Sequence, residues 1–217
     1  MIVKRVLIIT ISMMFVVGCE SVDRIIDGSR DQVVKNVEIP KVTILMAGQS
    51  NMERMEWYAK DAMKSAYIEY HGSADIEFIG CSVGGTWSGQ WLPGNGLLED
   101  CLVKSAGKNV THLIYWQGES DAYNSIPYWG VNFSKTIAGF RKGLGDIPVV
   151  FAQIAYTTDP DWNRGWESIK QQQAAVCISG VKMIKTDDVA VLSDTVHIDD
   201  ASAKKIGRRF VLNMRSA

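Results

Sequence analysis

Two polar segments that lie far apart in the chain contain the residue types that acyl transfer requires. The first is GQSNM at 48–52, which follows the apolar run at 42–47 and places Ser50 where a buried strand turns into a helix. The second is DTVH at 194–197, which sets Asp194 and His197 close together in a loop. A serine hydroxyl becomes a good nucleophile when a histidine takes its proton and a carboxylate orients that histidine. These residues therefore predict serine esterase chemistry.

Each segment also has a structural explanation when it is considered alone. Ser50 could be a helix N-cap, and its surroundings are not the GxSxG motif of the α/β-hydrolases because the second glycine is absent. His197 could form a local hydrogen bond at the start of a helix. The other histidines, His71 and His112, lack a carboxylate at the spacing that Asp194 provides. His197 is therefore the best candidate for the base.

Acyl transfer also needs hydrogen-bond donors for the oxyanion that forms on the substrate carbonyl. The Ser50 amide can give one, and the Gly84-Gly85 pair lets backbone N–H groups approach a substrate closely. The side-chain amide of Gln117 can give another. A plain turn at the two glycines and a loop-stabilising hydrogen bond from Gln117 are the alternatives.

Several other residues of the loop-like stretches could contact a substrate. Glu119 and Asp121 could form the carboxylate pair of a glycosidase, but so close together in one loop they are expected to brace it instead. Four tryptophans could either line a groove for sugar rings or anchor the loops in the core, namely Trp87, Trp91, Trp129 and Trp162.

The scaffold for these motifs is predicted from an alternation of strands and helices. Strands are predicted at 42–47, 76–80, 111–116, 147–154 and 181–184. Helices are predicted at 52–67, 97–105, 128–144, 166–176 and 201–214, the last with Asp199 or Asp200 as its N-cap. This alternation favours a mainly parallel five-stranded sheet covered on both faces. The loops after the first three strands should then form one site, at the carboxyl edge of the sheet.

Four blocks of sequence resemble the SGNH/GDSL-type hydrolases, and most closely their sialate O-acetylesterase and acetylxylan esterase branch. The blocks occur in the family's order, as GQSNM at 48–52, GGT at 84–86, WQGESD at 116–121 and DTVH at 194–197. The resemblance spans roughly residue 41 to the C-terminus. It implies a flavodoxin-like three-layer α/β/α fold and a carbohydrate O-acetylesterase that uses neither a metal nor another cofactor.

The resemblance also assigns roles by motif position. Its catalytic triad consists of Ser50, Asp194 and His197. Its oxyanion donors are the Ser50 amide, Gln117 and one glycine of the pair, for which we favour Gly85. Further candidate substrate contacts are Gln49, Asn51, Gly84, Thr86, Trp87 and Glu119. The family often has Gly-Arg soon after GQSNM, whereas this chain has Glu53-Arg54-Met55, a difference that bears on the substrate more than on the chemistry.

The N-terminus has the pattern of an export signal. Lys4 and Arg5 precede an apolar run at 6–17 that is short for a permanent membrane span. The run ends in VVGC, which resembles the bacterial lipoprotein signal, with Cys19 as the lipidated residue. An ordinary secretory signal and an uncleaved membrane anchor are the alternatives.

We therefore predict a signal peptide at 1–18, a tether at 19–40 and an SGNH-type esterase domain at 41–217. Lipid would hold the domain at a membrane of the bacterial cell envelope, on its periplasmic or surface face. Export also implies an oxidising compartment. Three cysteines remain there, so one disulfide is possible and its pairing is open among Cys81, Cys101 and Cys177.

Composition argues against two classes of partner. Lys and Arg (23) nearly balance Asp and Glu (24), so a net charge of −1 gives no electrostatic basis for binding nucleic acid. The chain has neither HExxH nor a pair of cysteines at zinc-ligand spacing, so no metal site is predicted.

The predicted substrate is an O-acetylated carbohydrate, deacetylated through an acetyl-serine intermediate. A membrane tether also suits a lipase or thioesterase that acts on lipid or other acyl esters. A third hypothesis is a non-catalytic, lipid-anchored protein that binds glycan at its surface. The presence of all three triad residues argues against the third hypothesis.

Overall fold

The computed structural model describes residues 39–160 and 163–214. The predicted signal peptide, Cys19 and the tether up to residue 38 lie outside these ranges, so those assignments stay predictions. None of the helices in the described ranges is long and apolar enough to cross a bilayer.

A parallel sheet forms the centre of the described domain, with the strand order β2-β1-β3-β4-β5. The strands are β1 (Lys41–Gly48), β2 (Asp75–Gly80), β3 (His112–Trp116), β4 (Val149–Ala152) and β5 (Val181–Ile184). Every residue of β1 after Lys41 is buried, as expected for a central parallel strand covered on both faces. Gly48 pairs with Trp116 of β3, so the loops that follow these two strands start side by side.

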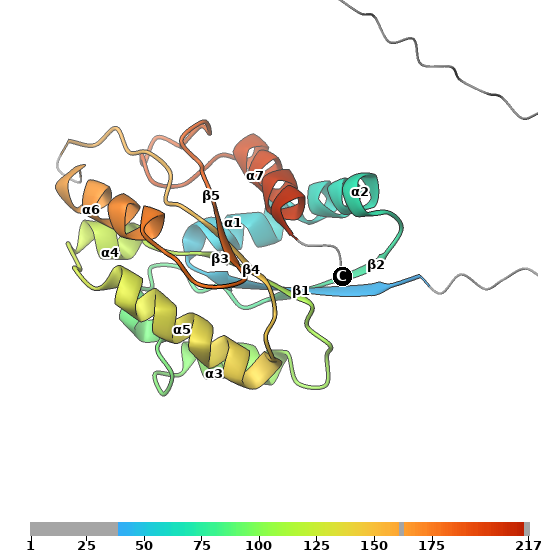
Figure 1. Ribbon diagram of the computed structural model, residues 1–217. Helices are drawn as coiled ribbons and strands as arrows, with labels where there is room; N and C mark the ends of the chain where they lie inside the picture. Colours follow the sequence, from blue (N-terminus) through green and yellow to red (C-terminus); the bar gives the residue numbers. More distant parts are fainter. Residues whose placement is uncertain (1–38, 161–162, 215–217) are drawn as a thin grey trace, which may run out of the picture. The chain divides into compact units, whose positions relative to one another are not determined.

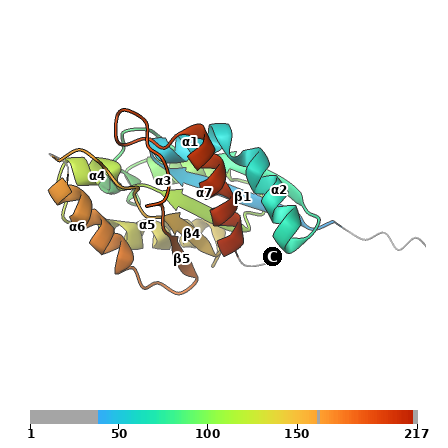
Figure 2. The ribbon, with the colours of Figure 1, turned by 90° about the horizontal axis from the view of Figure 1, so that it is seen from above.

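Helices cover both faces of the sheet (Figure 1). One layer consists of α1 (Ser50–Tyr58), α2 (Lys60–His71) and α7 (Asp200–Asn213). The opposite layer contains α3 (Leu97–Lys104), α5 (Trp129–Leu144) and α6 (Asn163–Ala174). Two short helices, η1 (Ser88–Trp91) and α4 (Glu119–Tyr123), lie in the loops after β2 and β3. Figure 2 shows α7 beside α2 above the sheet.

The alternation of side chains along β1 produces two separate cores. Ile44 and Met46 pack in the core that contains Phe210 of α7, whereas Leu45 packs in the core that contains Phe140 of α5. Burying apolar side chains on both faces is the main force that holds the layers together. The predicted three-layer α/β/α fold with a parallel five-stranded sheet is therefore confirmed.

Several boundaries differ from the prediction. The helix predicted at 52–67 is two helices that break at Ala59. Ala59 is fully buried beneath Gly207 of α7, where a Cβ on the glycine would lie 3.0 Å from the Ala59 Cβ. The bend lets α1 and α2 each follow the surface of α7. At the other end of the chain, the Asp199 side chain accepts from the Ser202 amide at 2.7 Å, which makes Asp199 the N-cap of α7.

Candidate active site

Ser50 is the first residue of α1 and lies at the carboxyl edge of the sheet. The turn before it requires a glycine, because Gly48 has a φ of +137° and a Cβ there would lie 2.0 Å from the carbonyl oxygen of Trp116. The Gln49 amide donates to that same carbonyl at 2.8 Å. The close approach of β1 and β3 therefore fixes the position of the serine.

A cavity of about 680 Å³ opens at Ser50. Ser50, Gly85, Asp194 and His197 all line it, so the structure brings together the triad residues and the favoured glycine. The Ser50 amide has no acceptor among the described residues, as is usual for an N–H in the first turn of a helix. That amide is available to a substrate oxygen, with the positive end of the helix dipole behind it.

The loop between β5 and α7 carries the other two triad residues. A short antiparallel bridge joins Val191 to Ile198, and the Leu192 amide donates to the His197 carbonyl at 2.7 Å. Between them Thr195 adopts a φ of +62°, which is uncommon for a β-branched residue. Backbone strain of this kind is common at active sites, where a loop holds its side chains in a fixed orientation.

Asp194 holds His197 by both backbone and side chain. Asp194 Oδ2 lies 2.8 Å from His197 Nδ1, and Asp194 Oδ1 accepts from the amides of Val196 at 3.0 Å and His197 at 2.9 Å. Partial burial raises the pKa of Asp194, but these hydrogen bonds outweigh it and the pKa lies below its ordinary value. The ionised carboxylate favours the proton on Nδ1, which leaves His197 Nε2 as the base.

The loop after β2 brings Gly85 to the cavity. Gly85 has a φ of +72°, and its N–H has no acceptor among the described residues. Two glutamates of α1 hold this loop, because Glu53 Oε1 accepts from the Gly84 amide at 2.9 Å and Glu56 Oε1 accepts from the Ser82 amide at 3.0 Å. The helix that begins with the nucleophile therefore also positions the Gly85 amide, and Gly84 itself does not line the cavity.

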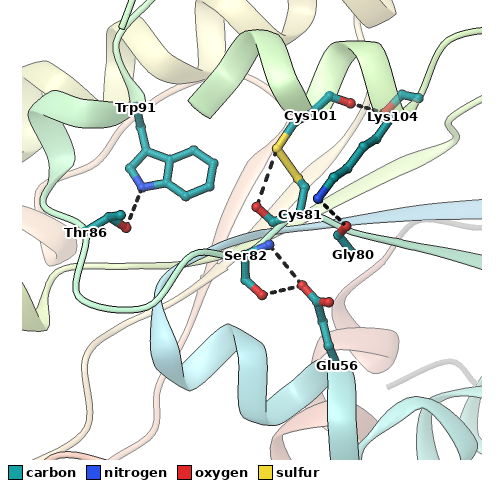
Figure 3. Close-up of a disulfide and its surroundings, with 9 residues drawn as sticks. Glu56, Gly80, Cys81, Ser82, Thr86, Trp91, Cys101 and Lys104 are labelled. Atoms are coloured by element: carbon teal, nitrogen blue, oxygen red, sulfur yellow. Dashed lines mark hydrogen bonds between the residues drawn. A yellow bond between two sulfur atoms is a disulfide. The ribbon is translucent and has the colours of Figure 1, made fainter. Parts of the chain in front are cut away.

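A disulfide between Cys81 and Cys101 fixes the same loop to α3 (Figure 3). Figure 3 shows Cys101 and Glu56 approaching the segment of Cys81 and Ser82 from two different helices. The structure thus answers the question of pairing that the sequence left open. Cys177 is a free, exposed cysteine.

Gln117, the predicted side-chain donor of the oxyanion hole, is not among the residues that line the cavity. Its side chain is buried, and Nε2 donates to Asp121 Oδ2 at 2.5 Å and to Gln49 Oε1 and the Thr86 carbonyl at 3.2 Å each. Its Oε1 accepts from Trp129 Nε1 at 2.8 Å. These contacts hold Gln117 between the loops of the site, and its role as an oxyanion donor stays a prediction.

Asn51 is also buried, and it connects three segments of the site rather than facing the cavity. Its Nδ2 donates to Glu119 Oε1 at 2.7 Å and to the Val196 carbonyl at 3.1 Å, while its Oδ1 accepts from the Ile198 amide at 3.0 Å. The prediction that Asn51 contacts substrate is therefore corrected. Asn51 fixes the loop of His197 relative to the helix of Ser50.

Glu119 lines the cavity but is almost completely buried. Burial raises its pKa, against the opposing effects of the Asn51 hydrogen bond and the nearby His197. Its Oε2 forms no hydrogen bond of ordinary geometry, although the Trp116 indole is close enough to lower the pKa slightly. Asp121 accepts from the Ser88 amide at 2.8 Å. The expectation that these two acids brace the loops agrees with these contacts.

Two more candidate substrate contacts lie away from the cavity. Thr86 is buried, donates to the Val83 carbonyl at 2.7 Å and accepts from Trp91 Nε1 at 3.0 Å. Trp87 is partly exposed but covers Gly89 instead of lining the cavity. Trp91 and Trp129 are fully buried anchors, which was the alternative to sugar binding. Trp162 lies outside the described residues.

Three cavity residues on α4 or at its C-cap were not predicted. They are Ser120, Tyr123 and Asn124, and the Tyr123 side chain is well exposed. Their i, i+3, i+4 spacing places them on one side of a helical turn, which is the signal in the sequence that could have found them. The helix has only five residues, which is too short for its periodicity to distinguish it from a loop.

The sheet and its edge loops define a hydrolase of the SGNH/GDSL type. A family model described as carbohydrate esterase, sialic acid-specific acetylesterase, matches residues 56–216, well over half of the 217 residues. The chain therefore belongs to this family of esterases. The match includes Gly85, Asp194 and His197 and begins just after Ser50.

Solved structures with the same fold share little sequence with this chain. A protein of Arabidopsis thaliana is 17% identical, with a TM-score of 0.67 over 81% of this chain and 100% of the other. A carbohydrate acetylesterase from Xanthomonas citri is 16% identical, with a TM-score of 0.60 over 79% of this chain and 55% of the other. A carbohydrate acetylesterase from Sinorhizobium meliloti is 15% identical, with a TM-score of 0.55 over 78% of this chain and 96% of the other. No curated protein sequence matches this chain.

Proposed function

We propose that this protein removes acetyl groups from sugar hydroxyls of a glycan or polysaccharide through an acetyl-Ser50 intermediate. The observation that carries the proposal is the shared cavity, which is lined by Ser50 and by a histidine that Asp194 already orients. The family description and the titles of the structures from Xanthomonas citri and Sinorhizobium meliloti support a carbohydrate acetyl ester as the substrate class.

In the first step Ser50 Oγ bonds to the acetyl carbonyl carbon, and His197 Nε2 takes the hydroxyl proton. The carbonyl π electrons move to oxygen, and the amides of Ser50 and Gly85 stabilise that oxyanion. As the oxyanion collapses, the bond to the sugar oxygen breaks and His197 returns the proton to that oxygen. The free sugar hydroxyl then leaves.

In the second step His197 removes a proton from water, and the water oxygen bonds to the carbonyl carbon of acetyl-Ser50. The second oxyanion collapses, releasing acetate and returning the proton to Ser50 Oγ. Asp194 remains ionised throughout and stabilises the imidazolium that forms in each step. Among the described residues the Ser50 hydroxyl forms no hydrogen bond, and we expect it to bond to His197 Nε2 when substrate is bound, while Asp194 holds Nδ1.

The rim of the cavity offers a surface for a sugar ring. Tyr123 has 61% of its surface exposed, and Asn124 lies next to it on the same rim. An exposed aromatic face can stack on the apolar face of a sugar, while amide and hydroxyl groups bind its polar edge. In this arrangement the acetyl group points toward Ser50 and the sugar lies over α4.

An extracytoplasmic location belongs to the same proposal. The Cys81–Cys101 disulfide is typical of a protein from an oxidising compartment, which supports export. We propose that Cys19 carries the lipid that holds the domain at the cell envelope. Metabolic labelling with an alkyne fatty acid should then mark the wild-type chain and leave Cys19→Ala unlabelled.

The activity is tested with the full chain, purified in detergent, beside its Ser50→Ala variant. The substrates are p-nitrophenyl acetate, p-nitrophenyl butyrate and a panel of O-acetylated glycans, with acetate measured directly. We expect the wild type to favour acetyl esters and Ser50→Ala to lose about 10³-fold or more in kcat at an unchanged melting temperature. A preference for butyrate would favour the lipase hypothesis. Inertness of both folded proteins on every substrate would favour the glycan-binding hypothesis.

A further inference from the structure

The cavity at Ser50 is much larger than an acetyl group. Its volume of about 680 Å³ lies in the range of pockets that hold a whole drug-sized ligand. The total volume therefore cannot favour acetyl over longer acyl groups. A preference for acetyl must come from the side chains that the methyl group touches when the ester carbonyl lies at Ser50.

Val196 has the only aliphatic side chain on the wall of this cavity, among the described residues. Apart from the Tyr123 ring, the other side chains on the wall, Gln49 among them, are polar or ionisable. Tyr123 lies at the exposed rim, whereas Val196 is only 9% exposed. An acetyl methyl group gains free energy when it leaves water for an apolar surface, and Val196 is the buried apolar surface that the wall offers.

Backbone hydrogen bonds hold Val196 close to the catalytic residues. Its carbonyl accepts from Asn51 Nδ2 at 3.1 Å, and Asn51 directly follows Ser50 in the chain. Its amide donates to Asp194 Oδ1 at 3.0 Å. Val196 is therefore bonded both to the segment of the nucleophile and to the residue that orients the base.

The side chain of Val196 has little freedom to move. It belongs to the same apolar core as Leu45 and Phe140, so it is supported on the side away from the cavity. A β-branched side chain is also stiff about its first torsion angle. Beside it Glu119 is held by the same amide, because its Oε1 accepts from Asn51 Nδ2 at 2.7 Å. This part of the wall is a fixed surface that cannot withdraw to make room for a longer acyl chain.

We infer that Val196 is the residue that limits the acyl group of the substrate to acetyl. The inference rests on the proposed acyl transfer at Ser50 and deepens it, because it assigns the two ends of the ester to different parts of the cavity. The acetyl methyl group lies against Val196 at the buried wall, and the sugar lies at the exposed rim with Tyr123. An acyl chain with further methylene groups meets the Val196 side chain and the core behind it.

Val196→Ala in the full chain removes two methyl groups from this wall. We expect the ratio of kcat/KM for p-nitrophenyl butyrate to kcat/KM for p-nitrophenyl acetate to rise about tenfold. The melting temperature should fall, because a buried side chain is shortened. The ratio of the two kcat/KM values does not depend on how much of the protein is folded, so a purely structural role of Val196 would leave it unchanged.

Val196→Ile is the opposite change, and it tests the inference even if Val196→Ala fails to fold. The added methylene narrows the space, so p-nitrophenyl propionate and butyrate should lose about tenfold in kcat/KM relative to acetate. Val191→Ala is the matched control, because Val191 is a partly buried valine of the same loop that does not line the cavity. Its ratio of butyrate to acetate should stay within about twofold of the wild-type ratio.

The outcomes distinguish this inference from the proposed function. If Ser50→Ala abolishes activity and neither Val196 variant shifts the ratio of butyrate to acetate, the assignment of Val196 is wrong and the esterase stands. If Val191→Ala shifts the ratio as far as Val196→Ala does, a general loosening of the loop explains the change and the assignment is again wrong. If Ser50→Ala retains activity, the proposed acyl transfer itself is wrong.

Discussion

At the scale of single residues, a few buried side-chain amides set the geometry of the site. Asn51 uses both of its N–H groups and its oxygen to join α1, α4 and the loop of His197. A buried amide with all its partners satisfied is a rigid connector, because breaking one bond leaves a buried polar group unpaired. The triad is therefore held by residues that do not touch the substrate.

Asn51→Asp should disrupt this connection. A carboxylate oxygen would replace Nδ2 and face Glu119 Oε1 and the Val196 carbonyl, so repulsion replaces two hydrogen bonds. We expect a loss of about 2–4 kcal/mol in unfolding free energy, measured by urea titration, and a fall in kcat as His197 shifts. Asn95→Asp is the control, because exposed Asn95 donates to the Gly89 carbonyl at 2.7 Å. Equal losses in the two variants would contradict the special role of Asn51.

The contact between Asp194 and His197 could be predicted from the sequence for a physical reason. The roles of Asp194 and His197 depend on a local spacing, which survives in the folded loop as a 2.8 Å contact. The hydrogen-bond partners of Gln117 could not be predicted, because they come from segments that are distant in sequence. Those partners include Gln49, the Thr86 carbonyl and the Trp129 indole, and they meet only when the loops and α5 pack together.

At the scale of elements, α1 links the nucleophile to the second loop of the site. Its glutamates Glu53 and Glu56 are one helical turn apart and bind the amides of Gly84 and Ser82. Glu53 stands where the family often has Gly-Arg, so a departure from the family pattern has a structural use in this chain. The disulfide holds the same loop from the opposite layer.

Removing the disulfide with Cys81→Ser and Cys101→Ser should affect stability more than catalysis. The bridge closes a loop with a sequence separation of 20, for which a loss of about 3 kcal/mol in unfolding free energy is expected. The contacts from Glu53 and Glu56 remain, so kcat should stay within about tenfold. Melting temperature and kcat of the double variant test this, with Cys177→Ser as the unchanged control. A collapse of kcat at full stability would show that the disulfide alone aligns Gly85.

The strands were predicted more accurately than the helix boundaries. The strands were found because residues such as Ile44 and Leu45 are buried on opposite faces, which produces compact apolar runs. The break at Ala59 and the short helix α4 were missed. Both depend on packing against elements distant in sequence, which local periodicity does not record.

At the scale of the whole molecule, the charge around the cavity bears on the choice of substrate. The protein has a net charge of −1, and the cavity is lined by the carboxyl groups of Asp194 and Glu119. The pKa of Asp194 lies below its ordinary value, so it is ionised at neutral pH. None of the described lining residues is Lys or Arg. An anionic sugar would therefore enter a field that repels it.

We accordingly expect neutral O-acetylated sugars to react faster than O-acetylated sialic acid, although the family is named for the latter. One negative charge about 8 Å away, partly screened, raises the energy of an anionic substrate by on the order of 1 kcal/mol, or about fivefold in kcat/KM. Acetylated xylo-oligosaccharide and 9-O-acetyl sialic acid provide the comparison. Raising the salt from 0.02 M to 0.5 M should speed the anionic substrate alone, because screening weakens repulsion. The opposite result would be that the anionic substrate reacts faster and that added salt slows it. That result would show a positively charged group at the sugar site.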